Sequence, residues 1–186
     1  MKFSATRLPG VVLIEPEVFA DDRGWFMETF SAPKFAAGLT SLGLPLPRAF
    51  VQDNESSSHS GVLRGLHYQL PPHPQGKLVR VACGAAFDVA VDVRRQSPTF
   101  GQWVGVELSE ANRRQLWIPE GFAHGFLALA DGTRVLYRTT DTYARDCERS
   151  IRWDDPAIAI DWPLDGAPLL AAKDAAAAPL READVF

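Results

Sequence analysis

The chain has 186 residues, 46% of them hydrophobic, and 23 acidic against 19 basic residues give a net charge of -4. This length suits one hydrophobic core and is short for two, so we expect a single domain over residues 1–186. No Lys/Arg run marks a nucleic-acid surface, and the apolar run at 11–14 is too short for a signal peptide or a membrane span. Cys83 and Cys147 form no CxxC pair, which favours free thiols and a cytoplasmic protein over a disulfide or zinc site.

Short strand-like segments follow one another along the chain, most of them separated by Gly, Pro, Asn or Asp. In chain order we expect a strand at 11–14, a short helix at 33–38, and strands at 78–82, 87–93, 103–108, 115–118, 125–130 and 133–140. A turn after Ser109 and an alanine-rich helical piece near Asp174 complete the predicted elements. We expect the segment from Pro163 onward to wrap the domain. This spacing predicts an all-β antiparallel sandwich or jelly roll.

Residues 87–93 show the clearest alternation. Phe87 and the three valines at 89, 91 and 93 share one face, and Asp88 and Asp92 share the other. The pattern predicts one buried face and one polar face.

His67 lies inside the apolar run at 62–69, where a strand needs no imidazole for burial. In a regular strand it shares a face with Leu63, Gly65 and Gln69 and projects into the interior of a barrel. A hydrogen-bonded core histidine is the alternative. Arg64 would oppose protonation of the ring and favour the neutral imidazole that a base requires, provided that the two share a cleft. Lys77 would act in the same way.

A metal site is the main rival interpretation of the histidines. His59, His67, His73 and His124 show no HxH or HExxH spacing, and Gln69 is a poor ligand. The pattern therefore predicts no metal.

Two tyrosines could line a binding cleft. Tyr137 and Tyr143 have the same parity, and six strand residues span roughly 20 Å, so a shared cleft would suit a long ligand. A core tyrosine with a bonded hydroxyl is the alternative for Tyr137. From the residues alone, Arg23 and Glu28 fit an ordinary surface pair better than a site. Residues 52–55 fit a polar turn equally well, and residues 173–174 fit a solvated pair or a helix cap.

Several motifs together closely resemble the dTDP-4-dehydrorhamnose 3,5-epimerase family. They are RGLHYQ at 64–69, GKLVR at 76–80, SPTFG at 97–101, IPEGFAHGF at 118–126 and YRTTD at 137–141, in the family's order. The resemblance extends over residues 19–30, 52–54, 151–156 and 173–174. Residues 144–148 depart from the usual wording of their loop but keep Glu148.

The resemblance implies a cupin-like jelly roll that assembles as a homodimer and needs neither metal nor organic cofactor. Its substrate would be dTDP-4-dehydro-6-deoxy-D-glucose, inverted at C3 and C5. The C4 carbonyl acidifies the hydrogens on both neighbouring carbons, so removal of one gives an enolate, and a proton returned from the opposite face inverts the centre.

The family pattern also implies roles for individual residues. His67 would accept the proton, Tyr137 would donate one, and Asp174 would pair with His67. Lys77 would stabilise charge on the C4 oxygen. Tyr143 would stack on the thymine ring. The remaining substrate-binding positions are Arg23, Glu28, Gln52, Asp53, Asn54, Arg64, His124, Glu148 and Lys173, with Lys77 counted among them as well.

Other functions fit parts of the same pattern. A related sugar-nucleotide epimerase acting at C3 or C5 alone, or a ketoisomerase, would share the scaffold. A metal-dependent cupin enzyme and a non-catalytic sugar-nucleotide binding module belong to different classes.

Overall fold

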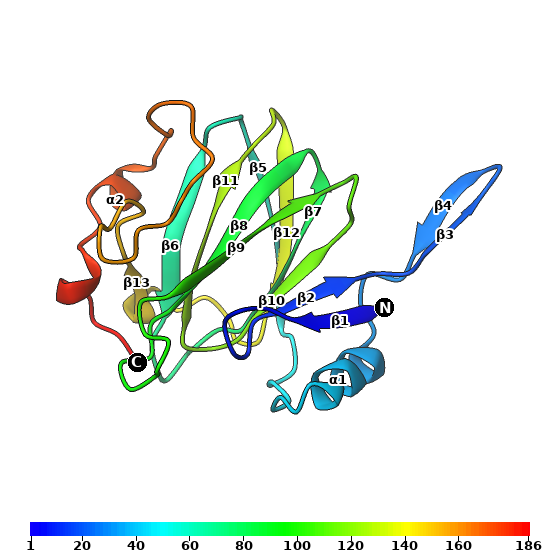
Figure 1. Cartoon of the computed structure of the whole chain (residues 1–186), viewed down its shortest axis with the longest axis horizontal. Coiled ribbons are helices and arrows are strands. Elements are labelled where there is room, and N and C mark those ends of the chain that lie inside the picture. The colour runs from blue at the N-terminus through cyan, green and yellow to red at the C-terminus, as the bar shows by residue number, and fades with distance from the viewer.

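The computed structural model describes residues 1–186, and two antiparallel sheets make up most of it (Figure 1). The six-stranded sheet has the order β1 (Lys2–Ala5), β2 (Val12–Glu15), β10 (Gln115–Ile118), β7 (Lys77–Cys83), β12 (Thr133–Thr139), β5 (Gln52–Ser58). The five-stranded sheet has the order β13 (Glu148–Ser150), β6 (Leu63–Gln69), β11 (Phe122–Ala128), β8 (Ala85–Asp92), β9 (Trp103–Ser109). The prediction of an all-β, cupin-like jelly roll is confirmed.

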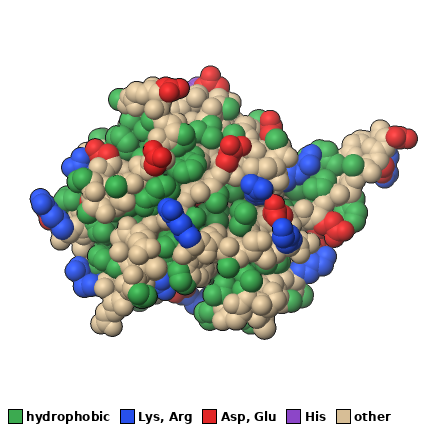
Figure 2. Space-filling view, in the orientation of Figure 1, with side chains coloured by type: hydrophobic (Ala, Val, Ile, Leu, Met, Phe, Trp, Pro, Cys, Tyr) green, Lys and Arg blue, Asp and Glu red, His purple; other side chains and the backbone are tan.

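A separate two-stranded hairpin, β3 (Val18–Asp21) and β4 (Gly24–Met27), projects from the body of the molecule (Figure 1). Its strands pair only with each other. Figure 2 shows this arm standing clear, with acidic and basic groups at its tip. We call residues 18–27 the arm. Three of its aromatic side chains are exposed: Phe19, Trp25 and Phe26.

The helices are few and short. α1 spans Ala32–Ser41 and is longer than the predicted 33–38, because Phe35 and Leu39 lie one turn apart and both pack against the outer face of the six-stranded sheet. α2 spans Ala172–Ala175, at the predicted alanine-rich piece. Two 3₁₀ turns, η1 (Arg145–Cys147) and η2 (Leu180–Glu182), complete the elements.

Two hydrophobic layers lie on either side of the five-stranded sheet. One fills the space between the sheets, with Val79 and Val135 from one sheet facing Ala90 and Phe126 from the other. The second covers the outer face and includes Trp162 and other side chains of the C-terminal segment. That segment also forms parallel bridges, Val62 with Leu169 and Ile151 with Ala178.

The polar face predicted for residues 87–93 is as buried as the apolar one. Val89 and Val91 pack under the C-terminal segment, so the opposite face points between the two sheets, and Asp88 and Asp92 are fully buried. The alternation itself is as predicted. Because the C-terminal segment covers the outer face of the sheet, the face with Asp88 and Asp92 is enclosed as well.

Strand β6 is not regular around His67. β11 pairs His124 with His67 but Phe126 with Arg64, which is a register shift. Gly65 has φ +125°, and a Cβ on it would lie 2.6 Å from the Cα of Gly125. Arg64 and His67, three residues apart, therefore both line the cleft described next. Leu63 packs in the layer beneath the C-terminal segment and also borders this cleft.

Candidate active site

A cleft of about 760 Å³ opens beside the inter-sheet core and is lined by both sheets and by the C-terminal segment. Eleven of the predicted site residues line it: Gln52, Asn54, Arg64, His67, Lys77, His124, Tyr137, Tyr143, Glu148, Lys173 and Asp174. A second cavity, of about 530 Å³, lies between α1 and the segment before β5, and it is mostly apolar. The acid/base groups gather in the first cleft alone.

His67 and Asp174 form a short pair at the wall of the cleft. Asp174 Oδ1 lies 2.6 Å from His67 Nε2, and its Oδ2 lies 3.5 Å from the backbone N–H of Gly65. Burial raises the pKa of the Asp174 carboxyl, but the hydrogen bond and charge of His67 and the Gly65 N–H outweigh it and leave that pKa below its usual value. Because an ionised carboxylate only accepts, Nε2 carries the hydrogen and Nδ1 keeps its lone pair for an incoming proton.

Lys77 is the buried cation of the cleft. It lies at the start of β7, with Nζ 3.5 Å from the backbone oxygen of His67. Burial lowers the pKa of its amine to about 8, although the charges of Asp88 and Glu148 act in the opposite direction. A cation in surroundings of low dielectric interacts strongly with any negative charge that develops beside it.

Tyr137 faces the cleft from the opposite sheet. It belongs to β12 in the six-stranded sheet, whereas His67 belongs to β6 in the five-stranded sheet. Burial raises the pKa of its phenol despite the nearby charges of Arg64 and Lys173, so the hydroxyl keeps its proton at neutral pH. A ligand between the sheets would meet a base on one face and an acid on the other.

A second histidine–aspartate pair lies deeper in the cleft. His124 Nε2 is 2.9 Å from Asp88 Oδ2, and both side chains are buried. The second oxygen of Asp88 has no hydrogen-bond partner. We did not predict Asp88 as a site residue, since its strand pattern placed it on the polar face. Ala86 and Ala90 share a strand face with Asp88, and these small apolar neighbours indicate that the face is enclosed.

The far end of the cleft carries a carboxylate between an aromatic ring and a cation. Glu148 Oε2 accepts a hydrogen bond from the Tyr143 hydroxyl at 3.1 Å, and Oε1 lies 2.9 Å from Lys173 Nζ. Burial raises the pKa of Glu148, but Lys173, Tyr143 and His67 together hold it below its usual value. Tyr143 is 55% exposed, which leaves a face of its ring free for a ligand.

Strand β5 divides the predicted residues 52–54 between two faces. Gln52 and Asn54 point into the cleft and are joined by a 2.8 Å hydrogen bond. Asp53 points the other way, where it pairs with Arg138 at 3.3 Å. The segment is therefore a strand and not a polar turn.

Arg23 and Glu28 also lie outside the cleft of their own chain. Arg23 is at the tip of the arm and pairs with Asp21 at 2.6 Å. Glu28 pairs with Lys34 at 2.9 Å near the base of the arm.

No three His, Cys, Asp or Glu side chains are grouped so that they could hold a metal ion. His67 and His124 lie opposite each other in the β6–β11 pair, but each contacts a different aspartate. No helix is long and apolar enough to cross a membrane.

Comparison with known proteins gives consistent matches. A family model described as dTDP-4-dehydrorhamnose 3,5-epimerase matches residues 5–182. A relative of that name from Pseudomonas aeruginosa is 53% identical over 186 residues, which cover 100% of this chain and 99% of the relative. The chain belongs to the dTDP-4-dehydrorhamnose 3,5-epimerase family. Another relative of the same name, from Methanothermobacter thermautotrophicus, is 52% identical and is covered over 97% of its length.

Solved structures of the epimerase family have the same fold. The epimerase from Legionella pneumophila in complex with dTDP-4-keto-L-rhamnose superposes with a TM-score of 0.92 at 50% identity, covering 98% of this chain and 94% of that one. A 3'-monoepimerase from Streptomyces bikiniensis in complex with dTDP-quinovose has a TM-score of 0.85 at 35% identity, covering 95% and 86%. The fold thus accommodates both double and single epimerisation.

Proposed function

We propose that this chain converts dTDP-4-dehydro-6-deoxy-D-glucose to dTDP-4-dehydro-β-L-rhamnose by inverting C3 and C5. The observation that carries the proposal is the placement of His67 and Tyr137 on facing sheets of one cleft, which Lys77 also lines. Family membership and the names of the solved relatives support the same reaction.

The chemistry follows from the groups in the cleft. His67 takes the proton from C3 or C5, and the electron pair of that C–H bond moves into the ring and onto the C4 oxygen. Lys77 stabilises the resulting enolate charge, which exists only after proton removal. Tyr137 then protonates the carbon from the opposite face. Acid/base assistance of this kind is worth about 10² to 10⁴ in rate.

Asp174 serves the base without touching the substrate. It fixes the tautomer of His67 and favours the imidazolium that forms on proton transfer. The scheme requires no metal or organic cofactor, because Lys77 provides the electrostatic stabilisation. Full activity after treatment with a chelator checks this point.

The nucleotide would occupy the other end of the cleft. Tyr143 offers a free aromatic face for the thymine ring, and Arg64 and Lys173 provide positive charge for the diphosphate. We assign Gln52, Asn54, His124 and Glu148 to sugar and nucleotide contacts within the same chain.

We also propose a single-domain homodimer in which the arm of one subunit reaches the cleft of the other. Phe19 and Phe26 on the arm are 55% and 69% exposed, and such apolar groups on an unpaired hairpin are typical of an interface. Arg23 and Glu28 would then join the partner's site, as would Asp53 near its edge. The free thiols of Cys83 and Cys147 support a reducing, cytoplasmic setting.

Solvent labelling tests the reaction. In deuterated water the enzyme should place deuterium at both C3 and C5 of the product, because each inversion replaces a carbon-bound hydrogen. Label and inversion at one carbon alone would identify a monoepimerase. Binding without any exchange would identify a non-catalytic module and refute the proposal.

Two variants test the division of roles. His67→Ala should lower exchange by about 10² or more, because the base is missing. Tyr137→Phe should retain measurable exchange but lose inversion, since phenylalanine has no proton to deliver. Equal loss of exchange in both variants would contradict the assignment.

A further inference from the structure

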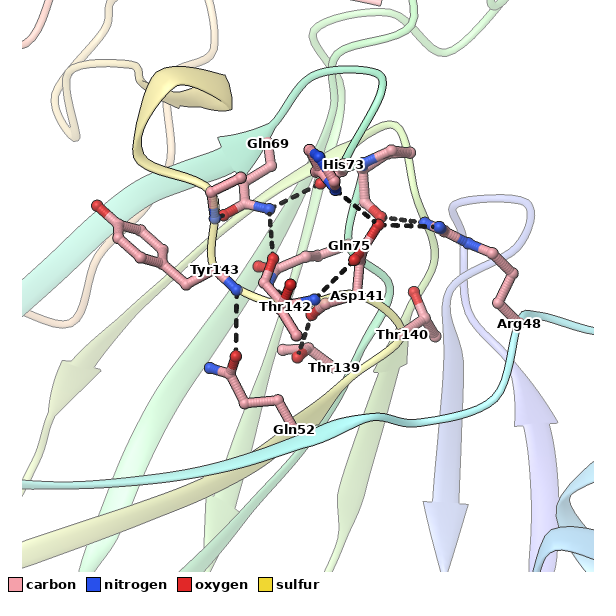
Figure 3. Close-up of polar contacts among 12 residues, drawn as sticks. Arg48, Gln52, Gln69, His73, Gln75, Thr139, Thr140, Asp141, Thr142 and Tyr143 are labelled. Carbon is pink, nitrogen blue, oxygen red and sulfur yellow. Dashed lines mark hydrogen bonds and ion pairs between the residues drawn. The ribbon is translucent and has the colours of Figure 1, made fainter.

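A cluster of polar side chains outside the cleft holds the segment that carries Tyr143 (Figure 3). Asp141, just beyond the end of β12, is its centre. Its Oδ2 accepts a hydrogen bond from Arg48 Nη1 at 2.9 Å and lies 3.3 Å from His73 Nδ1. Its Oδ1 accepts the backbone N–H of Thr142 at 2.8 Å. One carboxylate therefore connects three loops that are far apart in the sequence.

Arg48 extends the cluster to a fourth segment. Its Nε and Nη2 donate to Glu120 Oε1 at 3.1 Å and 2.9 Å, and Nη2 also contacts the backbone oxygen of Pro74. The Thr142 N–H, followed by Arg48 and His73, holds the pKa of Asp141 below its usual value in spite of desolvation. Asp141 therefore stays charged across the neutral range.

The backbone of Asp141 is held as firmly as its side chain. Gln75 Nε2 donates to its carbonyl oxygen at 2.9 Å, and the Thr139 hydroxyl donates to the same oxygen at 2.8 Å. These two hydrogen bonds therefore fix the path of the backbone after β12.

Two glutamines that line the cleft bind the backbone at Tyr143 and Ala144 (Figure 3). The N–H of Tyr143 donates to Gln52 Oε1 at 3.1 Å, and the N–H of Ala144 donates to Gln69 Oε1 at 2.9 Å. Gln69 Nε2 in turn donates to the backbone oxygens of His73 and Thr142, at 2.7 Å and 3.2 Å. Residues 141–144 belong to no helix or strand, so these contacts fix the backbone that carries the tyrosine ring, while the bond from its hydroxyl to Glu148 holds the outer end of the ring.

We propose that Asp141 is a positioning residue for the nucleotide: with Arg48 and His73 it fixes residues 141–144 so that the Tyr143 ring is in place before the thymine base arrives. This inference rests on the proposed function, in which Tyr143 receives that base. Asp141, Arg48 and His73 do not line the cleft, so they act through Tyr143. Fixing a loop in advance removes its ordering cost from binding, which raises affinity without changing the chemical step.

The test compares Asp141→Ala with the wild-type chain by calorimetric titration with dTDP and by steady-state kinetics. We expect Kd for dTDP and KM to rise roughly tenfold, with kcat within about twofold of wild type. In a Tyr143→Ala background the same change should alter Kd less than about twofold, because the group that it positions is gone. Asp131→Ala is the matched control, since Asp131 is 81% exposed on another loop and contacts His59 and Ser60, which lie outside the Asp141 cluster. It should leave both constants unchanged.

Three outcomes would overturn the inference: an unchanged Kd in Asp141→Ala, a fall in kcat at constant KM, or effects of Asp141→Ala and Tyr143→Ala that simply add. If Asp141→Ala does not fold, Asp141→Asn keeps an acceptor for Thr142 but weakens the Arg48 contact. It should raise Kd about threefold with the same dependence on Tyr143. A wild-type chain that binds dTDP but epimerises nothing would refute the proposed reaction, and the Kd comparison would still decide the role of Asp141.

Discussion

Lys77 combines a functional need with a structural cost. Its amine is buried, and its pKa of about 8 lies well below the usual value for lysine because desolvation disfavours the charged form. The folded state therefore binds the proton of Lys77 more weakly than the unfolded chain does. At neutral pH this difference destabilises the fold by about 3 kcal/mol.

Removing the charge should stabilise the protein and abolish its activity. Lys77→Met keeps most of the volume and needs no desolvation of a cation, so we expect the free energy of unfolding at pH 7 to rise by about 2 kcal/mol. The gain should be complete below pH 8, should shrink as the pH rises from 8 to 10.5, and should be absent above 10.5, where the lysine is neutral in both states. Urea unfolding at several pH values measures it. A less stable variant at pH 7 would contradict the assigned cost.

The same group should limit the reaction at high pH. As the pH rises through about 8, Lys77 of the free enzyme loses its proton and can no longer stabilise the enolate, so kcat/KM should fall. Lys77→Arg keeps a positive charge to much higher pH. Any activity that this variant retains should lack the alkaline limb, and a limb that persisted unchanged would assign it to another group.

Among the elements, the close pairing of β6 and β11 decides which side chains of β6 reach the cleft. Gly65 and Gly125 approach so closely that neither has room for a Cβ. This contact accompanies the register shift that turns both Arg64 and His67 toward the ligand. A side chain on either glycine would force β6 and β11 apart beside His67 and Arg64.

We expect Gly65→Ala to lower the free energy of unfolding by about 3 kcal/mol or more, through overpacking added to an unfavourable φ. Gly24→Ala is the matched control, because Gly24 has φ +127°, close to the +125° of Gly65, but nothing lies within 4 Å of the point that a Cβ would occupy there. It should cost about 1 kcal/mol. Thermal unfolding compares the two, and equal losses would show that backbone strain alone matters at Gly65.

The strands also show what the sequence could and could not reveal. The alternation of 87–93 was visible, but the layer formed by the C-terminal segment was not, so the pattern alone could not tell that Asp88 faces inward. β5 was missed because its sequence, QDNESSS, contains no apolar residue. Its inward positions face a polar cleft, where the usual signal of a buried strand is absent. The shift in β6 depends on a contact between two strands distant in sequence.

At the scale of the whole molecule, one chain does not bring all of the predicted site residues into its own cleft. The eleven in the cleft include the proposed base, acid and cation, and motif resemblance was sufficient to select them. Arg23 and Glu28 were selected in the same way, yet they lie on or beside the arm. Sequence spacing carries no information about which subunit supplies a side chain.

Mixing two inactive variants tests the proposed assembly. Arg23→Ala and His67→Ala should each be impaired as pure proteins. After unfolding and refolding together in equal amounts, activity should return to roughly a quarter of the wild-type value, because half of the dimers are mixed and one of their two sites is intact. No recovery in mixed dimers verified by mass would place Arg23 outside the partner's site.

Asp174 reaches His67 from a segment that crosses the outer face of the five-stranded sheet after all the strands have been made. Synthesis proceeds from the N-terminus, so the sheets can assemble before that segment has left the ribosome. During that interval the imidazole has no carboxylate to orient it. The proposed reaction therefore depends on a segment that follows every strand in the chain, and a product terminated before Asp174 should lack the carboxylate that orients His67.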